Sequence, residues 1–281
     1  MGSLKLFAMA GLVAAASTAA SAADLLPPPP PVYAPVAPAP VEIGGGWYLR
    51  GDIGVGVTNI DDFENVAHSP SPIHSYDVLR KSVDDQVFVG IGAGYQFNNW
   101  LRADVTGEYR TAAGFSALER ATRTDLGLVE GYSLYTGRIA SLVGLANVYA
   151  DLGTWSGITP FVGAGIGVAH HSVSDHRDQG LGGYAGGLGL AASESKTGLA
   201  WALHAGLGYQ VSSNLKLELG YRYLNMGDIE AGKIQCLPAL DQCSHSKIKG
   251  YDSHDFKIGM RWLLASSPAP VVYEQPLIRR Y

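Results

Sequence analysis

The clearest pattern in the chain is an alternation of apolar and polar positions over residues 87–110. In the first half every second residue is apolar, namely Val87, Val89, Ile91, Ala93, Tyr95 and Phe97. After Asn98 and Asn99 the alternation resumes, with Leu101, Ala103, Val105 and Tyr109 on one face. A period of two on both sides of an Asn-Asn turn predicts a β-hairpin. Each arm has about ten residues, the length that a tilted strand needs to cross a bilayer.

The same alternation recurs and predicts eight antiparallel strands, over residues 47–57, 87–97, 101–110, 134–152, 158–169, 199–209, 215–223 and 254–264. Long polar segments (58–82, 111–133, 170–196 and 225–253) alternate with short turns. The phase of 134–152 is ambiguous around residues 141–147, where a bulge is one explanation. Even strand number and alternating long and short connections are typical of bacterial outer-membrane barrels. We therefore predict an all-β fold, an eight-stranded antiparallel up-and-down transmembrane β-barrel over residues 45–264, with the long segments as four exposed loops.

A soluble eight-stranded barrel of the lipocalin type would alternate in the same way with its apolar face inward. Two features favour the membrane. Glycines gather on the polar parity, where a narrow interior needs small residues: Gly54, Gly56, Gly90, Gly92, Gly94, Gly163, Gly165, Gly167, Gly206, Gly208 and Gly220. Aromatic residues gather at strand ends and predict two girdles, an inner one of Trp47, Tyr95, Phe97, Trp100, Tyr209 and Trp262 and an outer one of Tyr109, Tyr135, Trp201, Tyr221 and Tyr223. No apolar run reaches the roughly 18 residues of a spanning helix.

The polar face of the predicted strands also carries charges of both signs. If the apolar face contacts lipid, these charges point into the lumen. The predicted network consists of Arg50, Asp52, Arg102, Asp104, Glu108, Arg110, Lys216, Glu218, Arg222, Asp255, Lys257 and Arg261. Buried charges must be paired because an isolated one is costly. A nearly balanced set of charges in so narrow a barrel predicts a cross-linked interior that conducts ions poorly or not at all.

The ends of the chain differ from the predicted barrel in composition. Residues 1–22 combine Lys5, a short apolar run and an Ala-Ser-Ala site, as in a secretory signal peptide. Residues 23–44 form a proline-rich periplasmic linker, and residues 265–281 form a C-terminal tail. Export to an oxidising compartment favours a disulfide between Cys236 and Cys243, the only cysteines. The net charge of −5, with no basic tract, is evidence against nucleic acid as a partner.

Several stretches resemble the small outer-membrane β-barrel surface proteins of Gram-negative bacteria, whose barrels are similar to the OmpA transmembrane domain. They are GWYLRGDIGVGV, VGIGAGYQFNNWLRADVTGEYR, TPFVGAGIGVA, WALHAGLGYQVSSNLKLELGYRYLNMGDI and DFKIGMRW. The resemblance implies location in the cell outer membrane, insertion by the barrel-assembly machinery and a role as a structural envelope protein and surface antigen, sometimes an adhesin or haem binder. Unlike in OmpA, we expect no C-terminal peptidoglycan-binding domain, and the sequence continues beyond its last predicted strand.

Few residues suggest other chemistry. His204 faces the predicted lumen and could belong to a lipid-modifying enzyme, although a structural histidine explains it as well. No G-x-S-x-G, H-E-x-x-H or P-loop motif is present, and we expect neither a catalytic site nor a cofactor. His170, His171 and His176 fall in a predicted outer loop and could bind a metal or haem iron. We therefore expect a structural barrel with exposed antigenic loops that contributes to envelope integrity. The alternatives are a ligand receptor or adhesin acting on host or neighbouring surfaces through those loops, and a lipid-modifying barrel enzyme.

Overall fold

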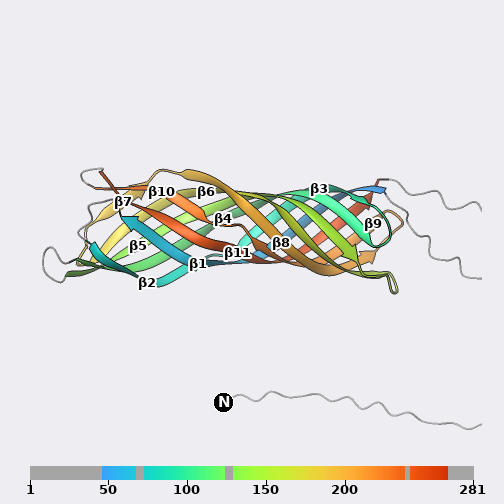
Figure 1. Ribbon diagram of the computed structural model, residues 1–281, viewed down its shortest axis with the longest axis horizontal. Helices are drawn as coiled ribbons and strands as arrows, with labels where there is room; N and C mark the ends of the chain where they lie inside the picture. Colours follow the sequence, from blue (N-terminus) through green and yellow to red (C-terminus); the bar gives the residue numbers. More distant parts are fainter. Residues whose placement is uncertain (1–45, 68–72, 124–128, 238–240, 265–281) are drawn as a thin grey trace, which may run out of the picture. The chain divides into compact units, whose positions relative to one another are not determined.

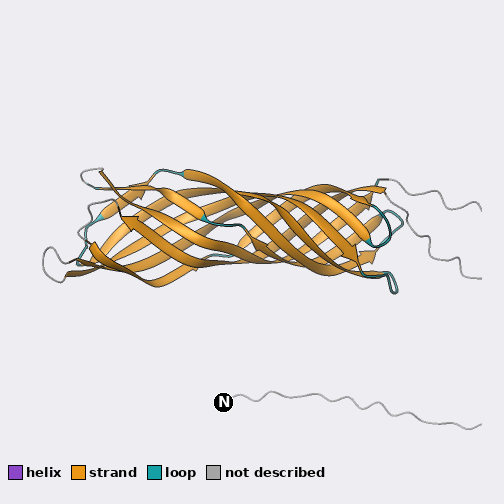
Figure 2. Ribbon diagram, in the orientation of Figure 1, coloured by secondary structure: helices purple, strands orange, loops and turns teal. Residues whose placement is uncertain are grey.

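The computed structural model describes residues 46–67, 73–123, 129–237 and 241–264, in which every regular element is a β-strand (Figure 2). Within these residues there is no helix long and apolar enough to span a bilayer. The predicted signal peptide, linker and tail lie outside the described residues.

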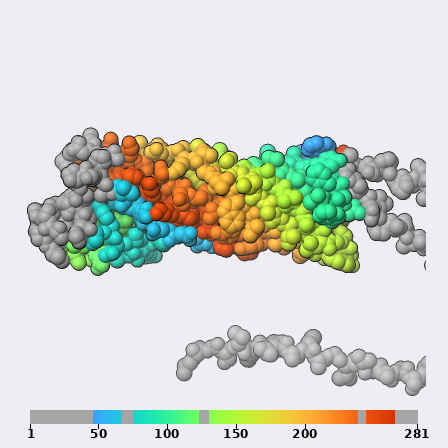
Figure 3. Space-filling view, viewed as in Figure 1, coloured from blue at the N-terminus to red at the C-terminus, as the bar shows by residue number. Residues whose placement is uncertain are grey.

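The strands are β1 Gly46–Ala67, β2 Ile73–Val83, β3 Gln86–Gln96, β4 Leu101–Arg123, β5 Val129–Asp151, β6 Ile158–Gly182, β7 Leu188–Ala191, β8 Glu194–Gln210, β9 Leu215–Asn225, β10 Ile229–Cys236 and β11 Asp241–Leu263. They form one antiparallel sheet that closes on itself where β1 pairs with β11 (Figure 1). In the space-filling view these two strands, blue and red, adjoin although they are far apart in sequence (Figure 3).

Three pairs of strands continue one another along the wall, so the eleven strands make a ring of eight. β2 and β3 both pair with β4, β7 and β8 both pair with β6, and β9 and β10 both pair with β11. The breaks fall at residues 84–85, 192–193 and 226–228. The prediction of an eight-stranded antiparallel barrel is confirmed.

The predicted long loops are wrong in extent, because most of their residues continue the wall of the barrel. β4, β5 and β6 have 23, 23 and 25 residues, about twice the length that a bilayer requires. The connections at this end are reduced to residues 68–72, 124–128, 183–187 and 237–240, and only the third is fully described. Tight turns at residues 97–100, 152–157 and 211–214 close the other end, where β1 begins and β11 ends (Figure 1).

The barrel has two parts with opposite amphipathicity. In the part near the tight turns, which we call the apolar belt, apolar side chains point outward, among them Ile53, Ile91, Val105, Ile166, Leu219 and Ile258. In the part beyond it, which we call the extension, apolar side chains point inward and polar ones outward. The buried core of the molecule lies mainly there and includes Ile60, Phe63, Phe115, Ala117, Ile139, Val173, Ile229, Ile234 and Ile248. This inversion explains why the strands of the extension read as polar loops in the sequence.

The inversion also corrects the expected place of Tyr135. This residue was expected in the outer aromatic girdle, but its side chain is 1% exposed and points into the extension. Tyr109, Trp201 and Tyr221 do lie on the outer surface. The ambiguous strand contains no bulge at residues 141–147, where its pairing with both neighbours is regular. The irregularities lie on the neighbouring strands, between Arg110 and Ala113 of β4 and near Asp175 of β6, which has a positive φ.

Candidate functional site

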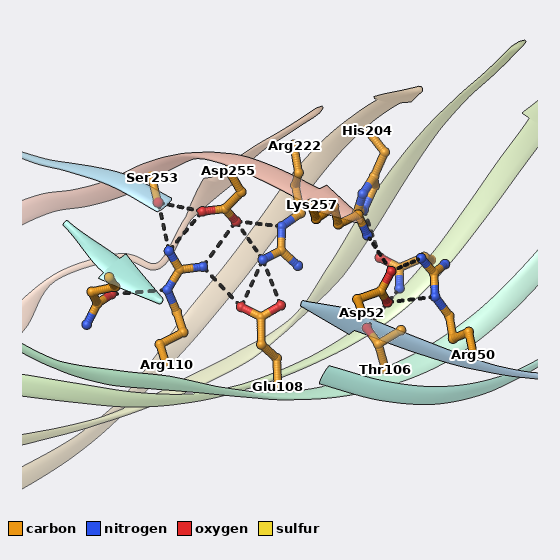
Figure 4. Close-up of polar contacts among 12 residues, drawn as sticks. Arg50, Asp52, Thr106, Glu108, Arg110, His204, Arg222, Ser253, Asp255 and Lys257 are labelled. Atoms are coloured by element: carbon orange, nitrogen blue, oxygen red, sulfur yellow. Dashed lines mark hydrogen bonds and ion pairs between the residues drawn. The ribbon is translucent and has the colours of Figure 1, made fainter. Parts of the chain in front are cut away.

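The interior of the apolar belt is filled by charged side chains (Figure 4). Asp255 on β11 is its most densely bonded acid. Arg110 donates to both of its oxygens, with Nη1 at 3.0 Å and Nη2 at 2.8 Å, and Arg222 donates from Nε at 2.8 Å. Ser253 donates a further bond at 2.6 Å. Glu108 bridges the two arginines, at 3.0 Å from Arg110 and 2.7 Å from Arg222. These residues come from β4, β9 and β11, so the cluster ties three parts of the wall together.

A second cluster lies closer to the tight turns and is centred on Arg50. Its guanidinium contacts Asp52 and Asp104, each at 2.8 Å, and Glu218 at 3.4 Å. Lys257 lies 3.7 Å from Asp52 and connects this cluster with β11.

At the tight-turn end, Arg102 and Arg261 share two acids, Asp151 and Glu218. Arg102 donates to Asp151 at 3.1 Å, and Arg261 lies 3.2 Å from Glu218. The Arg102 guanidinium also stacks over the rings of Tyr149 and Phe161, at 4.1 and 4.8 Å from their centroids. Asp151 was not predicted from the sequence, because the alternation along residues 134–152 did not show which side chains face the lumen. The alternation of its neighbours Asn147 and Tyr149 could have identified it.

The structure brings the sequence-predicted lumenal charges other than Lys216 together in these clusters, where they are buried. Lys216 is half-buried and belongs to none of the three clusters. Because every cluster joins acids and bases from several strands, the charges compensate one another without solvent. A lumen crossed by such pairs is a solid polar core, as expected for a barrel whose interior is just wide enough for side chains.

His204 lies in this core and is held by an amide. Its Nε2 is 3.1 Å from the Oδ1 of Asn147, and its ring centroid is 5.2 Å from that of Tyr149. The hydrogen-bond partner of Nε2 is therefore neither a serine nor a carboxylate, the partners that a histidine needs in a hydrolase. This arrangement favours a structural role for His204.

The three histidines considered as a loop metal site lie on β6, and the loop placement is corrected. Their side chains point to different surroundings because the strand alternates. His170 is exposed and contacts Thr197, whereas His171 is buried and donates from Nε2 to the carbonyl of Met226 at 3.0 Å. His176 is buried further along the extension, where burial lowers its pKa to about 4. Within the described residues no three His, Cys, Asp or Glu side chains are grouped so that they could hold a metal ion.

Cys236, at the end of β10, is disulfide-bonded. The only other cysteine of the chain is Cys243, whose side chain lies outside the described residues. The pairing of neighbouring backbone positions Gln235 and Gln242 brings the two segments side by side.

Comparison with known proteins places this architecture in a family. Residues 6–262 match the family described as outer membrane protein beta-barrel domain. An uncharacterised protein of Brucella abortus is 31% identical over 254 residues, covering 80% of this chain and 87% of the relative. A Rickettsia prowazekii protein whose name describes it as a candidate adhesin is 24% identical over 216 residues, covering 77% of this chain and 86% of the relative.

Among solved structures, that of Neisserial surface protein A is similar to 78% of this chain and 99% of its own, with 19% identity and a TM-score of 0.45. The family match spans nearly the whole described barrel, and the Brucella relative exceeds 30% identity over most of both chains. The chain belongs to the outer membrane protein beta-barrel domain family and is a protein of the bacterial outer membrane.

Proposed function

We propose that this protein is a structural, non-conducting barrel that anchors in the outer membrane and displays its extension on the cell surface, as a surface antigen that contributes to envelope integrity. The observation that carries the proposal is the ion-pair network across the lumen. Arg110, Arg222 and Asp255 have side chains that are at most 3% exposed, so the network leaves little room for water or ions.

The two-part wall supports the display role. The apolar belt has the surface that lipid requires, and we infer that lipid acyl chains cover it. The extension has a polar outer surface and its own apolar core, which is the arrangement of a protein standing in water. The belt would then act as the anchor, and the extension would carry its surface away from the membrane. Insertion by the barrel-assembly machinery stays a prediction.

Single-channel recording in planar bilayers tests the closed lumen. We expect the folded protein to give no stable conductance steps. A variant that removes several network side chains, Glu108→Ala with Arg222→Ala and Asp255→Ala, should conduct more than the wild type if it folds. Heat-modifiable migration on a gel would verify its folding. Regular, long-lived conductance of the unmodified protein would refute the proposal.

Adhesion is a second candidate function, and a specific feature of the extension favours it. Four exposed leucines lie near its far end, where β7 is hydrogen-bonded to both β6 and β10. They are Leu181, Leu188, Leu190 and Leu237, with exposed fractions of 37% to 43%. The backbone of Leu237 donates to Leu188 at 2.8 Å, so two of them lie on adjoining segments. Grouped apolar residues on a polar surface are typical of protein-binding patches. The adhesin-named relative agrees with this interpretation.

The patch can be tested by cell-binding assays with bacteria that express the protein. Leu188→Ser, Leu190→Ser and Leu237→Ser together should abolish binding to a protein-coated or host-cell surface. Leu79→Ser removes an exposed leucine, 49% exposed, on β2 and is the matched control. Equal binding by the triple variant and the control would exclude the patch as an adhesive surface.

A further inference from the structure

The extension contains a polar cluster that neither the closed lumen nor the display role explains. It consists of Asn65 on β1, Glu119 on β4, Tyr135 on β5, and His176 and Asp178 on β6, and we call it the acidic layer. Tyr135 is the direct cross-strand partner of Asp178. The layer lies in the extension, where Tyr135 also belongs to the buried apolar core, and it shares no residue with the charge clusters of the belt.

Tyr135 is the centre of this layer. The amide of Asn65 donates to its hydroxyl across the lumen. Both Glu119 and Asp178 lie within hydrogen-bonding reach of the same hydroxyl, while Asn65 also lies within reach of Glu119 and Ser133 within reach of Asp178. A phenol has only one proton to donate, so it cannot satisfy both carboxylates at once.

Several polar atoms of the acidic layer are not used in hydrogen bonds. Four of its buried atoms have no hydrogen-bond partner, namely Asn65 Oδ1, Glu119 Oε2, His176 Nδ1 and Asp178 Oδ1. Glu119 is 1% exposed and His176 is 2% exposed, so bulk water does not compensate these two residues. Within the described part of the chain, neither Glu119 nor Asp178 forms an ion pair with a lysine or arginine. The ionised form of the buried Glu119 is therefore costly, whereas Glu108 and Asp255 of the belt are each paired with arginines.

Aromatic rings pack against Tyr135 and His176 of the layer. The ring centroid of Tyr135 lies 5.2 Å from that of Phe63 and 6.4 Å from that of His176, and Phe115 lies 5.6 Å from His176. Tyr184, in the connection after β6, lies over Gly131, where even a Cβ atom would come within 2.3 Å of its ring. Its hydroxyl donates to the carbonyl of Ala121, one inward-facing position beyond Glu119.

This combination of groups indicates the chemistry of a ligand. Carboxylates beside aromatic faces suit an organic cation, because the charge is attracted by both and its N–H groups supply the missing donors. Calcium is less suitable, since it takes six to eight oxygen ligands, and the described residues contain no metal-ligating group of three or more. Asn65 and Asp178 are only half-buried, so the layer borders the surface at these two residues.

We propose that the acidic layer is a binding site for a primary alkylammonium group, in which Glu119 and Asp178 neutralise the charge, Asn65 and His176 accept N–H bonds, and the aromatic rings enclose the carbon chain. The ammonium group could come from a free amine or from a lysine side chain of a peptide, since both present the same chemistry. This inference goes beyond the display role and does not depend on the lumen being closed.

Isothermal titration calorimetry of the folded full-length protein in detergent at pH 8, where Glu119 is ionised, tests the site. Cadaverine is the free amine, and N-acetyl-lysine methylamide is the side-chain probe. We expect saturable binding of at least one probe and none of 1-pentanol, which has the chain without the charge. Glu119→Gln should weaken binding at least tenfold, and Asp178→Asn should do the same. Asp77→Asn removes an exposed acid on β2 and should leave binding unchanged.

Preference for one probe would identify the source of the amine. Absence of binding of both probes to the wild type would overturn the proposal, because ordered water would then satisfy the orphaned acceptors. Equal weakening by Asp77→Asn and Glu119→Gln would also overturn it, since the attraction would then be that of the whole acidic surface. Heat-modifiable migration of each variant separates loss of the site from loss of the fold. The titration measures amine binding and not ion conductance, so a negative result would leave the closed-lumen proposal untouched.

Discussion

Replacing Asp255 by asparagine is the sharpest test of the lumenal network. The carboxylate receives hydrogen bonds from Arg110, Arg222 and Ser253, and its side chain is fully buried. Asparagine has nearly the same shape but carries no charge and turns one acceptor into a donor. The substitution therefore leaves two buried guanidinium groups to share Glu108 alone.

The expected effect follows from the burial of the pair. Removing one partner of a buried ion pair costs about 3–5 kcal/mol because the other charge is left uncompensated. Since Asp255 is paired with two arginines, we expect Asp255→Asn to lower the free energy of unfolding by about 5 kcal/mol, the upper end of this range. The pair of Arg120 and Asp77 is the matched control, because it has a similar distance of 2.9 Å but side chains that are 39% and 53% exposed. Asp77→Asn should cost about 1 kcal/mol or less.

Urea unfolding from lipid vesicles measures both free energies, with the folded fraction read from heat-modifiable migration on gels. Adding Arg110→Gln to Asp255→Asn removes the surplus positive charge. The double variant should therefore lose less stability than the two single variants predict together. Equal costs for Asp255→Asn and Asp77→Asn, or strict additivity in the double variant, would refute the claim that the network is a coupled, desolvated unit.

Three further predictions concern other parts of the barrel. Gly167→Ala should cost about 3 kcal/mol of stability or prevent assembly, because a Cβ atom there would lie 1.9 Å from the carbonyl oxygen of Gly144. A Cβ atom at Gly144 would meet nothing within 4 Å, so Gly144→Ala should be tolerated. The urea midpoints of the two variants would test this difference. Burial raises the pKa of Glu119 from 4.5 to about 7. Between these two pH values the folded state keeps a proton that the unfolded chain releases. The free energy of unfolding should therefore fall by about 3 kcal/mol as the pH rises from about 4.5 to about 7. Unfolding at pH 4.5 and 8 should show a smaller loss for Glu119→Gln, and an unchanged loss would contradict the assignment. Alkylation followed by mass spectrometry should label Cys236 and Cys243 only after reduction, and labelling without reduction would contradict a bond between them.

The sequence by itself determined the belt and its contents. A strand has a period of two, so the alternation around Ile91 and Val105 assigns each residue to a face without any knowledge of its neighbours. Because the lumen is narrow and lipid excludes charge, Arg50, Asp255 and the other charges on the opposite parity had to point inward.

Tertiary structure decided the extension and the partnerships. An alternating strand does not specify which medium lies on each face, so Ala113, Phe115 and Ala117 are compatible with a polar loop until the neighbouring strands enclose them. Partners such as Arg110 and Asp255 lie 145 residues apart and meet only through the register of the closed ring. The acidic layer depends on the same closure, because Glu119 and Asp178 look like ordinary surface acids until the wall removes them from water.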